Sequence, residues 1–287
     1  EAARAYHGGP LAFEAAPHQA QMITDSFTSG QLGVPTDSAA AATAMSTGQK
    51  VHNTVVSVAL PGDLSDLETM GEYFKARDKS VGLVTTSYLT DATPAAMAGH
   101  ALIRFQTPLI ANDYLTRTKV DVLLGGGGNG LSAEAGLAAG YTIVSDRAGL
   151  QALGANPPGP VLGLFGESAE GMPFEWDHAQ GTDAGYDTLP FLHEMASSAL
   201  SFLEDDADGF FLMIEQEGTD LAGHQGGASP DRIGRDVFAA LEFHRAVETV
   251  LDWIAGRDDT LLIVTADHET GGLEVPAGNG EGVLPTV

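Results

Sequence analysis

Short apolar runs alternate with longer stretches of helical spacing along most of the chain. The runs end in small or polar residues, as buried strands of a parallel sheet do, and lie at 80–87, 120–128, 141–146, 161–165, 209–215 and 260–268. Helices are predicted at 66–77, 145–153, 189–204 and 230–256. This alternation predicts an α/β fold, a three-layer sandwich with a central, mainly parallel β-sheet flanked by helices.

No linker or internal repeat divides the chain, so we predict one domain over residues 1–287. The segments 154–163 and 166–188 are rich in Gly, Pro or acidic residues and are expected to be loops within it. A hydrophobic content of 43% in 287 residues is enough for a full core.

The charge balance is strongly acidic, with 13 basic and 39 acidic residues and a formal net charge of −26. Phosphate backbones attract the opposite sign, so nucleic acid is not an expected binding partner. Such a surface suits high salt, and an acidic secreted protein explains it equally well.

No apolar run is long enough to cross a bilayer, and Glu1–Pro10 has neither the basic start nor the apolar stretch of a signal peptide. We therefore expect a soluble protein without membrane contact, processed or truncated ahead of Glu1. With no cysteine and nine histidines, a tight metal site would have to use His and carboxylate ligands.

Polar residues close several of the predicted strands. Asp91 comes shortly after 80–87, Glu215 ends 209–215, and Asp267 with His268 ends 260–268. Ligands of open α/β sheets gather outside the carboxyl ends of the strands, so these residues are candidates for a site. Taken singly, each of them is equally compatible with an ordinary loop start.

The stretch TDSAAAATAMSTG, residues 36–48, predicts a helix that starts near Thr36 to Ser38. A serine there sits beside unpaired backbone N–H groups and the positive end of the helix dipole, which favour a phosphate or an alkoxide. An ordinary N-cap by Thr36, Asp37 or Ser38 is the alternative interpretation.

The stretch IEQEGTDLAGH places Asp220 and His224 four residues apart, on one face of a helix. That spacing suits a shared zinc ion, and Glu215 could reach a neighbouring hard cation. A surface ion pair between Asp220 and His224 is the alternative. Glu217 competes with Glu215 for the cation.

The stretch VTADHETGG puts Asp267 and His268 before a glycine-rich turn at Gly271 and Gly272. Adjacent residues of a strand point to opposite sides, so both reach one metal only where the chain turns. The alternative is a buried histidine whose hydrogen bonds are satisfied.

In TDATPAAMAGHALIR, Pro94 fits the first turn of a helix that Thr93 could cap, with Asp91 at its start. Arg104 follows, and a guanidinium can hold two phosphate oxygens in a bidentate fork. Arg104 as a plain surface residue is the alternative.

In their order and spacing, these four motifs resemble the alkaline phosphatases. VDVLLGGG and VLGLFGESAEGMPFEWD resemble connecting segments of the same family, so the resemblance runs over essentially the whole chain. It implies Ser38 as the nucleophile that becomes a phosphoserine, Arg104 as the clamp on the phosphoryl group, and Asp37 as the residue that positions Arg104.

The resemblance also implies two zinc ions and one magnesium ion as cofactors. One zinc would take Asp220 and His224, and the other would take Asp267 and His268 and hold Ser38 as its alkoxide. The magnesium ion would draw on Thr93 and Glu215, with Asp91 acting through bound water. Two metals about 4 Å apart neutralise charge at both the attacking and the leaving oxygen of a phosphoryl transfer.

The resemblance is incomplete at both ends. The family's aspartate that bridges a zinc and the magnesium should precede Glu1, and a histidine that completes the first zinc site should follow His268. Each zinc thus has two protein ligands in this sequence, and we expect a fragment of a longer protein.

The expected function is hydrolysis of small phosphate monoesters by a periplasmic or secreted enzyme. Two alternatives stay open: a phosphodiesterase or sulfatase of the same superfamily, and a metal- or phosphate-binding protein without turnover. Dimers are common in the family, so a homodimer is expected by analogy alone.

Overall fold

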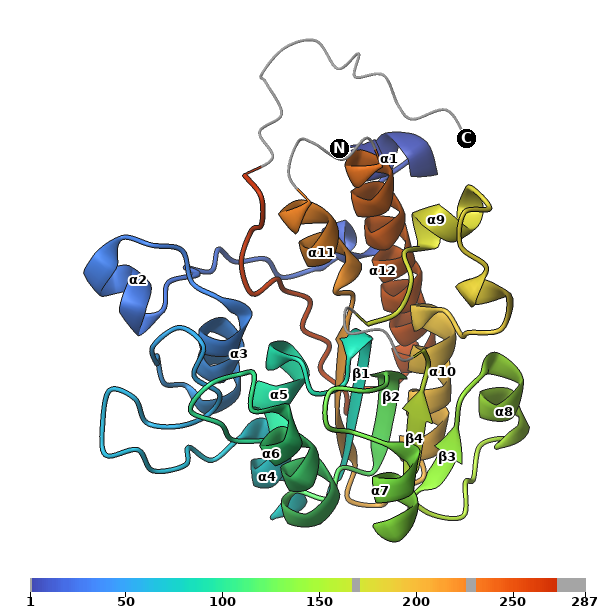
Figure 1. Ribbon diagram of the computed structural model, residues 1–287. Helices are drawn as coiled ribbons and strands as arrows, with labels where there is room; N and C mark the ends of the chain where they lie inside the picture. The colour runs from blue at the N-terminus through green and yellow to red at the C-terminus, as the bar shows by residue number, and fades with distance from the viewer. Residues whose placement is uncertain (1, 167–170, 226–230, 273–287) are drawn as a thin grey trace.

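A single parallel sheet organises the computed structural model, which describes residues 2–166, 171–225 and 231–272 (Figure 1). Its strands are β1 (Ser80–Tyr88), β2 (Val122–Gly126), β3 (Thr142–Val144), β4 (Val161–Leu164) and β5 (Phe210–Glu215). The strand order is β3-β4-β2-β1-β5, and every neighbouring pair is parallel. The predicted α/β class is confirmed.

Helices cover both faces of the sheet (Figure 1). The first face carries α3 (Ser38–Thr47), α4 (Met70–Lys75), α5 (Ala92–Ala98), α6 (Thr107–Asn112), the π-helical turn η2 (Asp113–Arg117) and α7 (Ala133–Ala138). The second face carries α8 (Arg147–Ala152), α10 (Leu192–Leu203) and α12 (Arg232–Ile254). The remaining elements are α1 (Ala2–His7), η1 (Ala12–Ala15), α2 (Phe27–Leu32), α9 (Glu175–Ala179), η3 (Gly185–Asp187) and α11 (Gly218–His224).

The central strand β1 separates two apolar cores by simple alternation. Val81 and Leu83 point into the core beneath α5, whereas Val84 points into the core beneath α10. All three side chains are fully buried. Both faces of β1 are covered, so this run is apolar and does not alternate between apolar and polar residues as a half-exposed strand does. The same alternation continues into the residues that end the strand.

The four predicted helices are present in the structure. Helices α8, α10 and α12 fall within the predicted ranges. Helix α4 begins at Met70, later than predicted, because Thr69 caps it and Glu72 closes a capping box. Among the described residues, no helix has both the length and the apolar character needed to cross a membrane.

The sixth predicted strand, 260–268, is wrong as a sheet strand. The segment is extended but carries no ladder hydrogen bonds among the described residues, so β5 is the edge of the sheet. Leu261 and Ile263 are 83% and 72% exposed. An apolar run shows that a segment favours burial, but strand pairing also requires a neighbour that the local sequence does not specify.

The predicted loop 166–188 also contains structure. Its described part, 171–188 with residue 166, forms the short helix α9 and the turn η3. Trp176 and Tyr186 are buried there, and Trp176 packs on Phe238 of α12. These two aromatic anchors, rather than a helical repeat, hold the segment, so the periodicity of apolar residues did not reveal it.

Two glycines allow helix α11 and the turn after residue 268 to touch. A Cβ on Gly271 would lie 2.2 Å from the carbonyl oxygen of Gly223, and one on Gly223 would lie 2.9 Å from Thr270. Gly271 also has φ +76°, in the left-handed region. This backbone contact sets the separation between His224 and His268.

A buried histidine joins three elements of the first face. His100 Nδ1 lies 3.3 Å from Asp113 Oδ2, and its Nε2 lies 3.3 Å from Glu72 Oε2. Burial alone would lower the pKa of His100, but the hydrogen bonds to Asp113 and Glu72 outweigh burial and the opposing charge of Arg117 and raise it to about 9. His100 is therefore a cation that ties the end of α5 to α4 and η2.

Replacement of His100 by Gln should remove a pH dependence of stability. The folded-state pKa exceeds that of the unfolded chain, so this contribution is complete below about pH 6.5 and is lost as the pH rises through about 9. Between those values the unaltered protein should lose on the order of 2 kcal/mol relative to His100→Gln. Denaturant titrations at several pH values measure this difference, and parallel curves for the two proteins would contradict it.

Replacement of Gly271 by Ala should destabilise the protein more than replacement of Gly272. Both glycines have positive φ, +76° and +56°, so both variants bear the backbone cost of about 1 to 2 kcal/mol. Only at Gly271 does the new methyl group collide with Gly223, since nothing lies within 4 Å of a Cβ on Gly272. Thermal unfolding of the two variants measures the difference, and equal losses would show that the contact is not tight.

Candidate active site

The start of α3 presents Ser38 to the carboxyl edge of the sheet. Asp37 is the N-cap, and its Oδ1 accepts a hydrogen bond of 3.1 Å from the Ala40 N–H. Ser38 is the first helical residue, is 7% exposed, and has its Oγ 3.0 Å from His268 Nε2. The helix start was predicted correctly, and it brings together residues 230 positions apart.

Arg104 lies in a loop after α5 and faces two carboxylates. One terminal nitrogen of its guanidinium is 2.6 Å from Asp91 Oδ1, and the other is 3.6 Å from Asp37 Oδ2. Its Nε is buried and has no hydrogen-bond partner among the described residues. Burial opposes the charge of Arg104, but Asp91 and Asp37 outweigh burial and raise its pKa. The sequence alternative of a plain surface arginine does not hold.

The backbone of Thr54 connects Asp37 to Arg104. Its N–H donates to Asp37 Oδ2 at 2.9 Å, and its carbonyl accepts from the Arg104 N–H at 2.7 Å. Thr54 reaches both by adopting φ +73°, an unusual value for a residue with a Cβ. Nothing in the sequence marked this residue, because the signal lies in its backbone conformation.

Asp91 and Thr93 at the start of α5 lie near Glu215, the last residue of β5. Asp91, rather than the predicted Thr93, caps α5, because its Oδ1 accepts the Ala92 N–H at 2.7 Å. Thr93 lies close enough to Glu215 to lower its pKa, and Glu215 accepts a hydrogen bond from Thr85 Oγ1 at 2.6 Å. Pro94 is the third residue of the helix.

Asp220, His224, Asp267 and His268 form the other side of the site. His224 Nε2 lies 3.2 Å from Asp220 Oδ2, as the helical spacing predicted. His268 Nε2 lies 3.2 Å from Asp267 Oδ2. Thr270 joins the two pairs, because its hydroxyl donates to Asp220 and lies 3.2 Å from His268 Nδ1. Thr270 was missed, although it stands two residues after His268.

Negative charge accumulates at this edge beyond what Arg104 can neutralise. Burial raises the pKa of Glu215 to about 8, with Asp91 and Asp267 adding to the effect and the Thr85 and Thr93 hydrogen bonds opposing it. Burial raises the pKa of Glu217 well above its usual range, and the negative charges of Glu215 and Asp91 add to this effect.

The donor set fits divalent cations. Carboxylate and hydroxyl oxygens suit magnesium, and imidazole with carboxylate suits zinc. Bound cations would relieve the repulsion that raises these pKa values. Among residues 2–166, 171–225 and 231–272, no group of three or more Asp, Glu or His side chains is placed to hold a metal ion.

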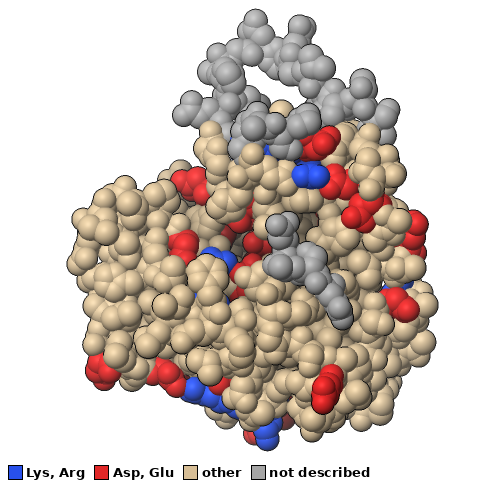
Figure 2. Space-filling model, in the orientation of Figure 1, with Lys and Arg blue, Asp and Glu red and all other residues tan. Residues whose placement is uncertain are grey.

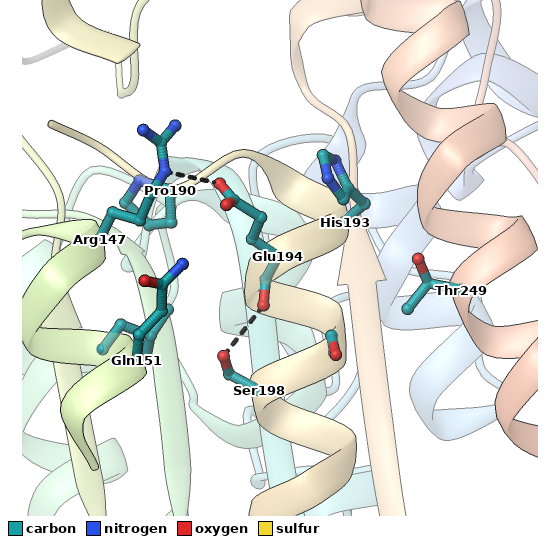
Figure 3. Close-up of a pocket in the computed structure, with 9 residues that line it drawn as sticks. Arg147, Gln151, Pro190, His193, Glu194, Ser198 and Thr249 are labelled. Atoms are coloured by element: carbon teal, nitrogen blue, oxygen red, sulfur yellow. Dashed lines mark hydrogen bonds and ion pairs between the residues drawn. The ribbon is translucent and has the colours of Figure 1, made fainter. Parts of the chain in front are cut away.

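The surface at this edge is hollowed. Acidic side chains gather there around a basic one, near the middle of the face shown in Figure 2. A separate cavity of about 300 Å³ lies between α8, α10 and α12 (Figure 3). Its charged groups are already paired: Arg147 Nε lies 2.9 Å from Glu194 Oε2, and His193 Nδ1 lies 2.6 Å from Glu242 Oε1. None of the predicted site residues lines it.

Comparisons with known proteins agree with the fold and the motifs. Residues 5–284 match the family model described as alkaline phosphatase. Alkaline phosphatase 3 of Bacillus subtilis is 36% identical over 257 residues, which cover 84% of this chain and 51% of that protein. The chain therefore spans about half the length of this relative.

Solved structures give the same result. The cold-active alkaline phosphatase of Shewanella sp. superposes with a TM-score of 0.76 at 31% identity, covering 97% of this chain and 67% of that one. A mutant of the TAB5 alkaline phosphatase with Mg bound in its M3 site gives a TM-score of 0.74 at 27% identity, covering 92% of this chain and 72% of that one. The chain belongs to the alkaline phosphatase family.

Proposed function

We propose that this protein hydrolyses small phosphate monoesters through a phosphoserine on Ser38. The observation that carries the proposal is the position of Ser38 Oγ, at the start of α3 and 3.0 Å from His268 Nε2, with Arg104 held beside the same helix start by Asp37. Phosphoryl transfer depends chiefly on positioning and on neutralising charge, and these residues supply both.

In the proposed reaction, Arg104 binds two non-bridging oxygens of the substrate, and Ser38 Oγ attacks phosphorus. As the new bond forms, the Ser38 hydroxyl gives its proton to water; the bond from phosphorus to the leaving oxygen breaks, and that oxygen takes up a proton from water as the alcohol departs. Water then attacks the phosphoserine, which releases phosphate and restores the Ser38 hydroxyl. The N–H groups at the start of α3 stabilise negative charge on Ser38 Oγ during both steps.

We propose the metal ligands as the sequence suggested them. Asp220 and His224 would hold one zinc, Asp267 and His268 the other, and Thr93 with Glu215 a magnesium ion, which Asp91 would contact through water. When bound, these ions would supply positive charge at the attacking and leaving oxygens and lower the pKa of water. We also propose one catalytic domain over 1–287 and a periplasmic or secreted location.

Replacement of Ser38 by Ala should abolish turnover of an aryl phosphate, because no other described hydroxyl occupies the start of α3 beside His268. The rate should fall at least about 1,000-fold, since covalent catalysis is lost. Ser46→Ala is the matched control: Ser46 is also buried in α3, but it accepts the Met70 N–H at the far end of the helix. Full activity of Ser38→Ala would refute the nucleophile assignment.

Chelation of the full-length protein should remove its activity, and zinc with magnesium should restore it, because the buried carboxylates cannot position the site without cations. Rates with aryl monoester, diester and sulfate, measured before and after chelation, separate the candidate functions. The monoester should be fastest, since a bidentate guanidinium suits a group with several free oxygens. A faster diester or sulfate would favour the related hydrolases, and bound zinc without turnover would favour a binding protein.

A further inference from the structure

Three consecutive hydroxyl residues, Thr85, Thr86 and Ser87, precede Tyr88 at the carboxyl end of strand β1, and two of them support carboxylates of the candidate site. Thr85 Oγ1 donates to Glu215 Oε2 at 2.6 Å, and Ser87 Oγ donates to Asp91 Oδ2 at 2.7 Å. Thr85 and Ser87 point to the same side of the sheet because they are two residues apart. That side is the first face, on which α5 and the candidate site lie.

Thr86 points to the second face and serves a different structure. Its hydroxyl donates to Gln216 Oε1 at 2.7 Å and accepts the Glu217 N–H at 2.9 Å. Gln216 Oε1 also accepts the Gly218 N–H at 2.9 Å. The Thr86 and Gln216 side chains thus hold the N–H groups of the turn between β5 and α11.

Glu175 fixes the orientation of the Gln216 amide. Gln216 Nε2 donates to Glu175 Oε1 at 3.0 Å, and Tyr186 points its hydroxyl at the same oxygen. Because Oε1 of Gln216 receives two donors and Nε2 faces an acceptor, a flipped amide would put donors against donors. Glu175, Thr86 and Gln216 are all at least nine-tenths buried, so water does not easily replace a lost partner.

The turn held in this way lies between two groups of proposed metal ligands. Glu215 ends β5 and faces Thr93, whereas Asp220 and His224 project from α11. The direction in which α11 leaves the sheet decides how far Asp220 lies from Glu215. Hydrogen bonds to Gln216 and Thr86 fix that direction at residues 217 and 218.

We propose that Thr86 and Gln216 are positioning residues, which set the distance between the Glu215 and Asp220 halves of the metal site from the opposite face of the sheet. The inference rests on the proposed metal-dependent function. It assigns a role to residues that touch neither substrate nor metal and that act through the β5–α11 turn.

Replacement of Thr86 by Val, which keeps the shape and removes the hydroxyl, tests the proposal in the full-length protein. The Kd values for zinc and magnesium should rise about 10- to 100-fold, the usual effect of losing a partner behind a metal ligand. The rise in Tm that metal produces should shrink accordingly. Thr86→Ser keeps the hydroxyl and should restore both quantities.

Thr118→Val is the matched control, because Thr118 is also buried and donates to a backbone carbonyl, that of Ala98, at 2.7 Å. It should lower the Tm of the metal-free protein and leave both Kd values unchanged. Should Thr86→Val not fold, Gln216→Met makes the same comparison with a side chain of similar length.

Two results would overturn the inference. If the unaltered protein binds zinc or magnesium and Thr86→Val binds it with the same Kd, the positioning role is refuted while the proposed function stands. If the unaltered full-length protein binds neither ion, the proposed metal site fails and the positioning role fails with it.

Discussion

The burial of carboxyl groups close to one another is the constraint on which this site depends. Asp91, Glu215, Glu217, Asp220 and Asp267 act on one another electrostatically at the carboxyl edge of the sheet. Of these five, only Asp91 lies at ion-pair distance from the Arg104 guanidinium among the described residues, at 2.6 Å. Ionising these carboxyl groups is costly in a protein interior, and the raised pKa values of Glu215 and Glu217 express that cost, so a ligand that brings positive charge would favour their ionised forms.

The parallel sheet makes this concentration of charge possible. Because all five strands run in the same direction, their carboxyl ends meet at one edge, and residues far apart in sequence become neighbours. Because side chains alternate along β1, its consecutive hydroxyl residues face opposite sides of the sheet. Thr85 and Ser87 face the carboxylates, while Thr86 faces the core on the other side and holds the turn that follows β5.

Local signals explain which features could be predicted from the sequence. The strand ends, the cap of α3 and the pairing of Asp220 with His224 each depend on residues close together in the chain. The motifs also placed Ser38 and His268 in one site, although their contact spans 230 positions.

Features that depend on tertiary context were missed. Segment 260–268 has the composition of a strand, but no strand pairs with it among the described residues. Helix α9 is held by the burial of Trp176 and not by its own periodicity. Thr54 contributes through its positive φ, and Thr270 through its hydrogen bond to Asp220 of α11. Neither feature can be recognised from the residue type or from the neighbouring sequence.

The ion pair between Arg104 and Asp91 has a consequence for the end of the reaction cycle. Its 2.6 Å contact means that the guanidinium has a partner even when no anion is bound. Under the proposed function, inorganic phosphate would compete with Asp91 for one terminal nitrogen of Arg104, and Asp91 would remain as a partner of the guanidinium when phosphate leaves. Such competition would weaken the binding of phosphate and favour its release if the proposed function holds.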